Sequence, residues 1–286
     1  MEDLNKQPAV KSPEEAEKYG DLLKRVAEAD ILPTGEGEWS LEEFRQRLDN
    51  VFKEYGIAAL ARNNGKIFTT LSGGLDSTLS LAFLRKNFAE DEIVTFSMGG
   101  SVNHPDILYA RLAAEKFGSS HNEFIPTADE IQEALAEYKE RFQAGLEEAT
   151  KTGNADVYLL YKHISNFHPN TLLVHDGIDE LMGGYWNHRK DVPEEERRKI
   201  FADYWKVLIP DHLKPLIGTS ADFNIDLLFP YLDQRIIEVV SHIPLKDRTS
   251  VETSKKPLRE IARELGVPKE IIERPKRGQV GMLDIK

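Results

Sequence analysis

The residues with the clearest chemical potential form the segment Ser72-Gly73-Gly74-Leu75-Asp76-Ser77-Thr78. The segment follows a short run typical of a strand and precedes a run typical of a helix. In an open parallel sheet this junction is the ligand crevice. Two glycines allow backbone N–H groups to approach an anion, and the helix N-terminus adds donors and partial positive charge. The pattern predicts a phosphate-binding loop. It is not a Walker loop, because the Gly-Lys-Ser/Thr ending is absent, and an ordinary helix start capped by Asp76 is the alternative interpretation.

A second turn of this kind lies about 100 residues later, where residues 172–185 read Leu-Leu-Val-His-Asp-Gly-Ile-Asp-Glu-Leu-Met-Gly-Gly-Tyr. A strand-like run again leads into a glycine-containing turn, and this turn carries Asp176, Asp179 and Glu180. Acidic side chains beside a phosphate loop are explained best by a divalent cation between carboxylate and phosphate. Either turn alone is also typical of a helix cap. Together they predict that Asp76 and Asp179 converge on one Mg²⁺-binding region.

The elements around these turns alternate between strands and helices. We expect strands at 67–71, 93–98, 122–125 and 171–175, and helices at 78–88, 106–117, 128–146 and 155–167. Such alternation predicts an α/β fold, an open parallel sheet with helices on both faces. After Tyr185 the strand signals stop, and we expect helices at 193–207, 233–242, 255–265 and 268–274. The chain is accordingly divided into an N-terminal helical segment (1–60), an α/β domain with the loop (61–190) and a helical C-terminal lobe with a basic tail (191–286).

Composition restricts the chemistry further. The 286 residues include 37 basic and 49 acidic side chains, a net charge of −12, and no cysteine. The chain therefore has no disulfide, no cysteine zinc site and no thiolate nucleophile. It has no apolar run of the ~18 residues that a membrane span needs, and its N-terminus does not resemble a secretory signal, so we expect a cytoplasmic protein. An acidic chain is also a poor partner for nucleic acid.

Positive charge is concentrated at the end of the chain. Residues 255–286 carry nine basic and five acidic side chains. This basic tail either closes over an anionic ligand held elsewhere in the molecule or forms a pair of solvated amphipathic helices. If the tail turns at Pro275 and Gly278, we expect Arg274 and Arg277 to point away from any such ligand.

These motifs resemble those of the ATP pyrophosphatases, and in particular the synthetase domain of the asparagine synthetases and β-lactam synthetases. Residues 72–77 match the SGGxDS loop, and residues 176–185 resemble the GDGxDELFGGY element. Four further segments resemble family elements in the same order: 96–98, 117–121, 229–233 and 273–278. The resemblance spans roughly residues 41–282 and implies an adenine nucleotide alpha hydrolase-like fold.

The resemblance implies an ATP-dependent ligase that forms a carboxyl-adenylate, releases pyrophosphate and passes the acyl group to ammonia or another amine. It implies that Mg²⁺ is bound by Asp76 and Asp179. It assigns catalytic roles to Lys276, Asp176 and Asp233, with Lys276 neutralising charge on the phosphates. The residues implied for binding ATP are Leu71, Ser72, Gly73, Gly74, Asp76, Ser77, Thr78, Ser97, Met98 and Gly177.

The chain also departs from the family pattern. His175 replaces a small residue, and Gln279 replaces a phenylalanine. Ile178 is expected to place an apolar side chain near the acyl-acceptor pocket, which disfavours aspartate as the substrate. Because the sequence contains no cysteine, we expect no glutaminase domain of the family's type, and we expect the amine to be free ammonia, another amine, or ammonia from a separate glutaminase subunit. The oligomeric state is open, with a homodimer as one candidate. Two other interpretations remain: an ATP pyrophosphatase that modifies tRNA or a nucleobase, and a non-catalytic nucleotide-binding scaffold.

Overall fold

The centre of the molecule is a five-stranded parallel sheet, seen in the computed structural model, which describes residues 18–33, 38–142 and 154–274. The strand order is β3-β2-β1-β4-β5. The strands are β1 (Ile67–Thr70), β2 (Ile93–Met98), β3 (Ser120–Phe124), β4 (Thr171–Leu173) and β5 (Asp226–Leu228). Every residue of β2 is buried, as expected for a strand covered on both faces. The predicted open parallel sheet is confirmed.

The path of the chain creates a reversal between β1 and β4. From β1 the chain runs outward through α4 (Leu75–Asn87) to β2 and through α5 (Pro105–Phe117) to β3. It then returns to the other side of β1, forming β4 and β5. Parallel crossovers are right-handed, so the two halves of the sheet receive their helices on opposite faces. The carboxyl ends of β1 and β4 consequently border the crevice where ligands bind in such sheets.

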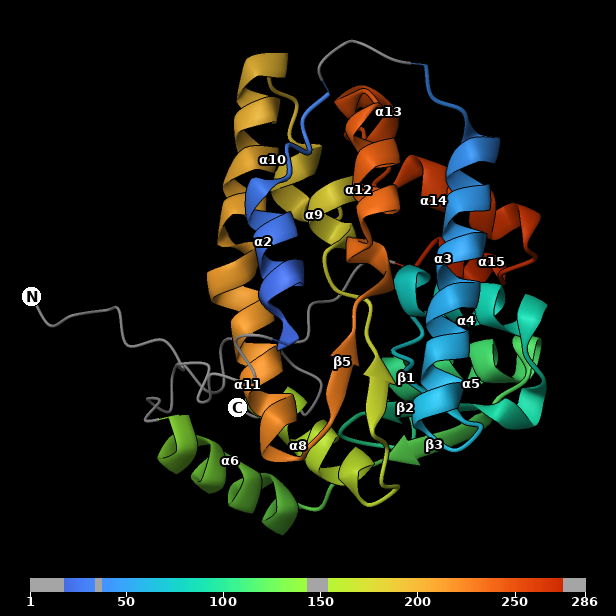
Figure 1. The fold of residues 1–286 in the computed structure, drawn as a ribbon, viewed down its shortest axis with the longest axis vertical. Coiled ribbons are helices and arrows are strands. Elements are labelled where there is room, and N and C mark those ends of the chain that lie inside the picture. Colours follow the sequence, from blue (N-terminus) through green and yellow to red (C-terminus); the bar gives the residue numbers. More distant parts are fainter. Residues whose placement is uncertain (1–17, 34–37, 143–153, 275–286) are drawn as a thin grey trace, which may run out of the picture.

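Helices cover both faces of the sheet (Figure 1). On one face α3 (Leu41–Arg62) packs against β1, β4 and α4, and α4 packs against α5. On the other face α8 (Asn154–Ser165) packs against α6 (Ala128–Phe142) and α11 (Lys214–Asp222), and α11 contacts β5. The aromatic core under α3 joins Phe52 to Phe83, with centroids 5.6 Å apart, and to Tyr231 at 5.2 Å. The predicted helix 128–146 is described only as far as Phe142.

The chain after β4 contains most of the remaining helices. They are α9 (Ile178–Met182), α10 (Glu194–Leu208), the π-helical η3 (Ile209–Leu213), α12 (Gln234–Ser241), α13 (Leu245–Arg248), α14 (Lys256–Glu264) and α15 (Lys269–Ile272). The short 3-10 segments are η1 (Glu90–Glu92), η2 (Trp186–Arg189) and η4 (Pro230–Leu232). Near the N-terminus, α2 (Gly20–Glu28) lies against this part, where Trp205 donates to the Val26 carbonyl at 3.1 Å. None of the helices in the described ranges is long and apolar enough to cross a membrane.

The expectation that strand signals stop after Tyr185 is wrong. β5 lies well beyond that residue and pairs in parallel with β4, with Leu172 opposite Leu227. Its three residues stand between Asn224, which has a φ of 55°, and Pro230, and a run this short shows no alternation of apolar and polar residues. The C-terminal third therefore contributes a strand to the sheet as well as helices. The division of the chain into three parts stays a prediction.

Candidate active site

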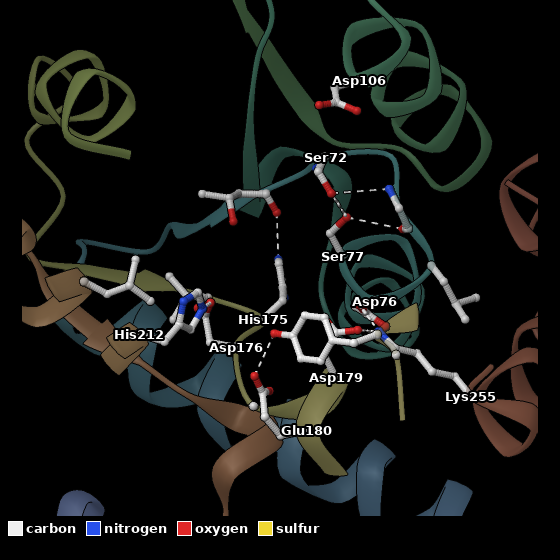
Figure 2. Close-up of a pocket in the computed structure, with 18 of the residues that line it drawn as sticks. Ser72, Asp76, Ser77, Asp106, His175, Asp176, Asp179, Glu180, His212 and Lys255 are labelled. Carbon is white, nitrogen blue, oxygen red and sulfur yellow. Dashed lines mark hydrogen bonds and ion pairs between the residues drawn. The ribbon is translucent and has the colours of Figure 1, made fainter. Parts of the chain in front are cut away.

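The 72–77 loop joins β1 to α4 and is held by its own serines. The Ser77 hydroxyl accepts from the Ser72 backbone N–H at 3.2 Å and lies 3.2 Å from the Ser72 hydroxyl (Figure 2). Gly73 has a φ of 64°, and a Cβ there would overlap with the backbone of Tyr109 and Ala110 on α5. Glycine is therefore required both for the turn and for the close approach of α5. The loop leaves the N-terminus of α4 facing the crevice.

Asp76 and Asp179 meet at a single buried ammonium group. Nζ of Lys255 lies 2.5 Å from Oδ2 of Asp76 and 2.6 Å from Oδ1 of Asp179 (Figure 2). Lys255 is only 4% exposed. Burial by itself lowers the pKa of Lys255, but the two carboxylates outweigh it and raise that pKa, so the ammonium stays charged. The predicted convergence of Asp76 and Asp179 is thus observed, and Lys255 bridges the two carboxylates. The sequence analysis counted Lys255 only as one of the basic residues of the tail.

The residue types and one unused oxygen suit a magnesium ion. Oδ1 of Asp76 is buried and has no hydrogen-bond partner among the described residues, so it is available to a cation. Within the same residues no group of three or more His, Asp or Glu forms a metal cage. Mg²⁺ is commonly bound by one or two carboxylates, with waters and substrate phosphates completing its shell. Asp76 and Asp179 would be its protein ligands.

The opposite wall of the cavity carries a second charged pair. His212, on η3, lies with Nε2 2.5 Å from Oδ1 of Asp176 (Figure 2). Burial lowers the pKa of His212, but the Asp176 carboxylate and its hydrogen bond outweigh this effect and raise the pKa to about 9. His212 is therefore an imidazolium at neutral pH. The π-helical turn is a geometry that is frequent at functional sites, yet no motif in the sequence pointed to His212.

Glu180 and Gly184 complete the acidic turn. The Tyr185 hydroxyl donates to Oε1 of Glu180 at 2.7 Å, and Glu180 is only 4% exposed. Burial, assisted by the neighbouring Asp179, raises the pKa of Glu180. A Cβ at Gly184 would overlap with the Asp179 carboxylate, so the second glycine of the Gly-Gly-Tyr element makes room for that carboxylate.

His175, which departs from the family pattern, joins the ends of β4 and β1. Its Nε2 lies 2.7 Å from the Thr70 carbonyl oxygen, and a carbonyl can only accept, so Nε2 carries the proton. Nδ1 is a buried acceptor without a partner among the described residues. Burial lowers the pKa of His175, which keeps the ring neutral. This histidine fixes the spacing of the two strand ends that form the site.

These groups surround one cavity of about 290 Å³. Of the sequence-predicted site residues, those that line it are Ser72, Gly74, Asp76, Ser77, Asp176, Gly177 and Asp179. Further lining residues that the sequence argument did not assign to the site include Lys255, His212, Arg259 and Arg274. Arg274 donates to the Ser72 carbonyl at 2.9 Å and pairs with Asp106. The expectation that Arg274 points away is therefore wrong: the part of the basic tail that the structure describes reaches the loop.

Other predicted site residues lie outside the cavity lining. Leu71 and Thr78 are buried behind the loop, and Gly73 packs on α5. Ser97 and Met98 are buried at the end of β2, where the Ser97 hydroxyl contacts His121 at 3.1 Å. Asp233 caps α12 by accepting from the Arg235 backbone N–H, and it pairs with the Arg235 guanidinium. Lys276 and Gln279 lie outside the described residues. Ile178 is fully buried and is not among the lining residues, whereas its neighbours Gly177 and Asp179 are, so its place near the acyl-acceptor pocket stays a prediction.

A glycine-rich loop and an acidic turn that meet at the reversal of a parallel sheet define an α/β protein with a candidate ligand site at the carboxyl ends of its strands. Comparison with known families then identifies the group: the family model described as asparagine synthase matches residues 57–219 and 218–283, so the chain belongs to that family. The resemblance inferred from the motifs is confirmed.

Individual relatives agree with this assignment. Human asparagine synthetase [glutamine-hydrolyzing] is 31% identical over 224 residues, which is 74% of this chain and 38% of that protein. The chicken protein of the same name is 30% identical over 253 residues, 86% of this chain and 44% of that protein. This chain therefore spans about two fifths of the length of these relatives. Among solved structures, NMN synthetase from Francisella tularensis has a TM-score of 0.47 and 17% identity, and the match covers 85% of this chain and 78% of that one.

Proposed function

We propose that this protein is an ATP-dependent ligase that adenylates a carboxylate, releases pyrophosphate and transfers the acyl group to ammonia or another amine. The observation that carries the proposal is the Lys255 ammonium, which bridges Asp76 from the β1 loop and Asp179 from the β4 turn. A buried ammonium between two potential metal ligands, beside an anion-binding loop, is suited to a polyphosphate with its cation.

The phosphate end of the site would hold ATP. The backbone amides of the 72–77 loop, the hydroxyls of Ser72 and Ser77 and the N-terminus of α4 offer donors to the departing pyrophosphate. Lys255 provides a positive charge that is already fixed in position before the substrate arrives, which favours the transition state over the ground state. A Mg²⁺ ion held by Asp76 and Asp179 would supply further neutralisation of the phosphate charge.

Two bond changes make up the proposed reaction. A carboxylate oxygen of the substrate attacks the α-phosphorus of ATP, and the bond to the β-phosphate oxygen breaks, so pyrophosphate leaves. An amine nitrogen then attacks the acyl carbon, and the bond to AMP breaks. The attacking nitrogen must lose a proton. Asp176 lines the cavity across from Lys255, and its carboxylate, held by the His212 imidazolium, is positioned to accept that proton.

The source of the amine belongs to the same proposal. The relatives at 31% and 30% identity are described as glutamine-hydrolyzing. For this chain we propose free ammonia, another small amine, or ammonia delivered by a separate glutaminase subunit.

Carboxylate-dependent exchange of labelled pyrophosphate into ATP tests the proposal. We expect exchange with Mg-ATP and a suitable acid in the absence of any amine, because the adenylate forms before the amine reacts. Replacing Asp179 by Asn should reduce this exchange by ~10²-fold. Formation of ADP and phosphate in place of exchange would contradict the proposal.

A further inference from the structure

Part of the cavity wall lies outside the 72–77 loop and the acidic turn and has a different chemistry. That part comes from Val157, Leu160 and Tyr161 on α8 and Leu216 on α11. We infer that this apolar wall, defined by these four residues, holds the body of the acyl substrate, and that this substrate is an apolar monocarboxylic acid. The inference rests on the proposed function and adds the substrate class.

The apolar wall is built from one helix face and one neighbouring side chain. Residues 157, 160 and 161 follow i, i+3, i+4 spacing, which places them on the same side of α8. All four side chains are at most 7% exposed while bordering the cavity. A hydrocarbon substituent placed there leaves water, and each CH₂ group so buried contributes about 0.8 kcal/mol, whereas a charged substituent would lose its hydration.

The charged groups of the cavity other than those at the phosphate end are two carboxyl groups and one imidazolium that is already paired. Asp176 and Glu180 line the same cavity as the apolar wall, and His212 is already paired with Asp176 at 2.5 Å (Figure 2). A second carboxylate on the substrate would therefore face two carboxyl side chains across a partly desolvated space. Such a carboxylate needs a cation to offset the loss of water.

The cations at the phosphate end are committed to protein partners. Lys255 contacts two carboxylates. Arg259 donates to the backbone carbonyls of Ser254 and Ile272, and Arg274 donates to the Ser72 carbonyl and pairs with Asp106. Among the described lining residues, the basic side chains are these three, His212 and His175. His212 is paired with Asp176, and His175 is neutral and donates to the Thr70 carbonyl. The site thus recognises one carboxylate, the one to be activated, beside an apolar body.

Pyrophosphate exchange across two series of acids tests this inference. One series is acetate, propionate, butyrate, hexanoate and phenylacetate, and the other is succinate, aspartate and glutamate. We expect kcat/KM for exchange to rise about fourfold per added CH₂ until the cavity is full, with the best apolar acid at least tenfold above every dicarboxylate.

Two variants test where the preference arises. Leu160→Lys adds a cation to the apolar wall and should raise succinate exchange relative to butyrate exchange. Ile57→Lys, at an exposed residue of α3 outside the cavity lining, should leave the ratio unchanged. If Leu160→Lys does not fold, Val157→Phe is expected to shift the preference toward shorter acids, because it reduces the cavity.

The possible results distinguish a failure of the inferred substrate class from a failure of the proposed ligase activity. Exchange that is faster with a dicarboxylate than with every apolar acid would overturn the substrate class and leave the ligase intact. Exchange with no acid, although Mg-ATP binds by calorimetry, would overturn the proposed function and the inference with it. An unchanged succinate-to-butyrate ratio in Leu160→Lys, in a folded protein, would remove α8 from the acyl site.

Discussion

Lys255 adopts a backbone conformation with a φ of 53°, in the left-handed region that residues other than glycine rarely occupy. It precedes α14, and its side chain spans 179 residues of sequence separation to reach Asp76. Strain of this kind persists where the surrounding structure fixes a functional group. The conformation positions an ammonium between the loop after β1 and the turn after β4.

Replacing Lys255 by Met should decrease exchange turnover by ~10²-fold, because a preorganised charge at the pyrophosphate is lost. Lys256→Ala is the matched control. The Lys256 ammonium donates to the Lys246 carbonyl on the surface, so this variant should retain full exchange. Equal activity of the two variants in steady-state kinetics would mean that the Lys255 bridge only holds the fold together.

The pair formed by His212 and Asp176 predicts a pH-dependent stability. The Asp176 carboxylate raises the pKa of His212 from 6.5 to about 9. The stabilisation of the folded protein by this pair is therefore fully present below pH 6.5 and disappears as the pH rises through 9. We expect the wild type to lose roughly 2 kcal/mol of unfolding free energy over this range relative to His212→Gln. Urea unfolding at pH 6, 7.5 and 9 measures the difference. Parallel profiles of the two proteins would contradict it, and His242→Gln, at an exposed histidine, should follow the wild type.

The sequence predicted Asp76 and Asp179 because each follows a strand end, and parallel strands bring their carboxyl ends to one edge. It did not single out Lys255 or His212. Lys255 is one of nine basic residues in its segment, and local spacing does not indicate which of them folds back onto the loop. His212 lies 36 residues from Asp176, in a turn whose π-helical geometry has no sequence signature.

The loop after β1 depends on the element it packs against. Gly73 and Gly65 both have positive φ, of 64° and 83°, but a Cβ at Gly73 would meet the backbone of α5, whereas a Cβ at Gly65 has nothing within 4 Å. Gly73→Ala should therefore displace the loop and weaken Mg-ATP binding at least tenfold. Gly65→Ala introduces backbone strain but no steric overlap, so this variant should bind Mg-ATP with the affinity of the wild type. Calorimetric titration with Mg-ATP compares the two, and equal affinities would mean that the loop does not bind the nucleotide.

Strands and helices of the first half of the chain were predictable, and β5 was not. β2 is six residues of buried, mostly apolar sequence and was predicted with its observed bounds. β5 has three residues and owes its pairing to β4, with Thr171 opposite Asp226, rather than to local pattern. The extended conformation of β5 results from its pairing within the sheet. This is a tertiary effect that the strand propensity of its own residues does not predict.

At the level of the whole molecule, Arg248 holds separate segments together. It is fully buried, and its guanidinium donates to the carbonyls of Ile243 at 2.9 Å, Leu181 at 3.0 Å and Ile31 at 2.7 Å. Burial lowers the pKa of Arg248 to about 9. One side chain thus joins the segment after α2, the helix α9 beside Asp179 and the segment between α12 and α13.

Arg248→Met should lower the unfolding free energy by about 3 kcal/mol, since three buried carbonyls lose their donor. Arg248→Lys should not restore it, because an ammonium lacks the guanidinium fork. Arg189→Met, which removes an exposed donor to the Val251 carbonyl, should change stability by less than about 0.5 kcal/mol. Denaturant titration that finds all three variants equally stable would contradict a joining role for Arg248.

The central claim is that a carboxylate oxygen of the substrate attacks the α-phosphorus of ATP, and the fate of oxygen-18 tests it directly. The best acid from the exchange series, labelled in both carboxylate oxygens, is converted to its amide with ATP, Mg²⁺ and ammonia. The mechanism predicts one labelled oxygen in AMP, the other in the amide, and none in pyrophosphate. Amide formation with the label in inorganic phosphate and ATP cleaved to ADP, or with AMP free of label, would contradict it.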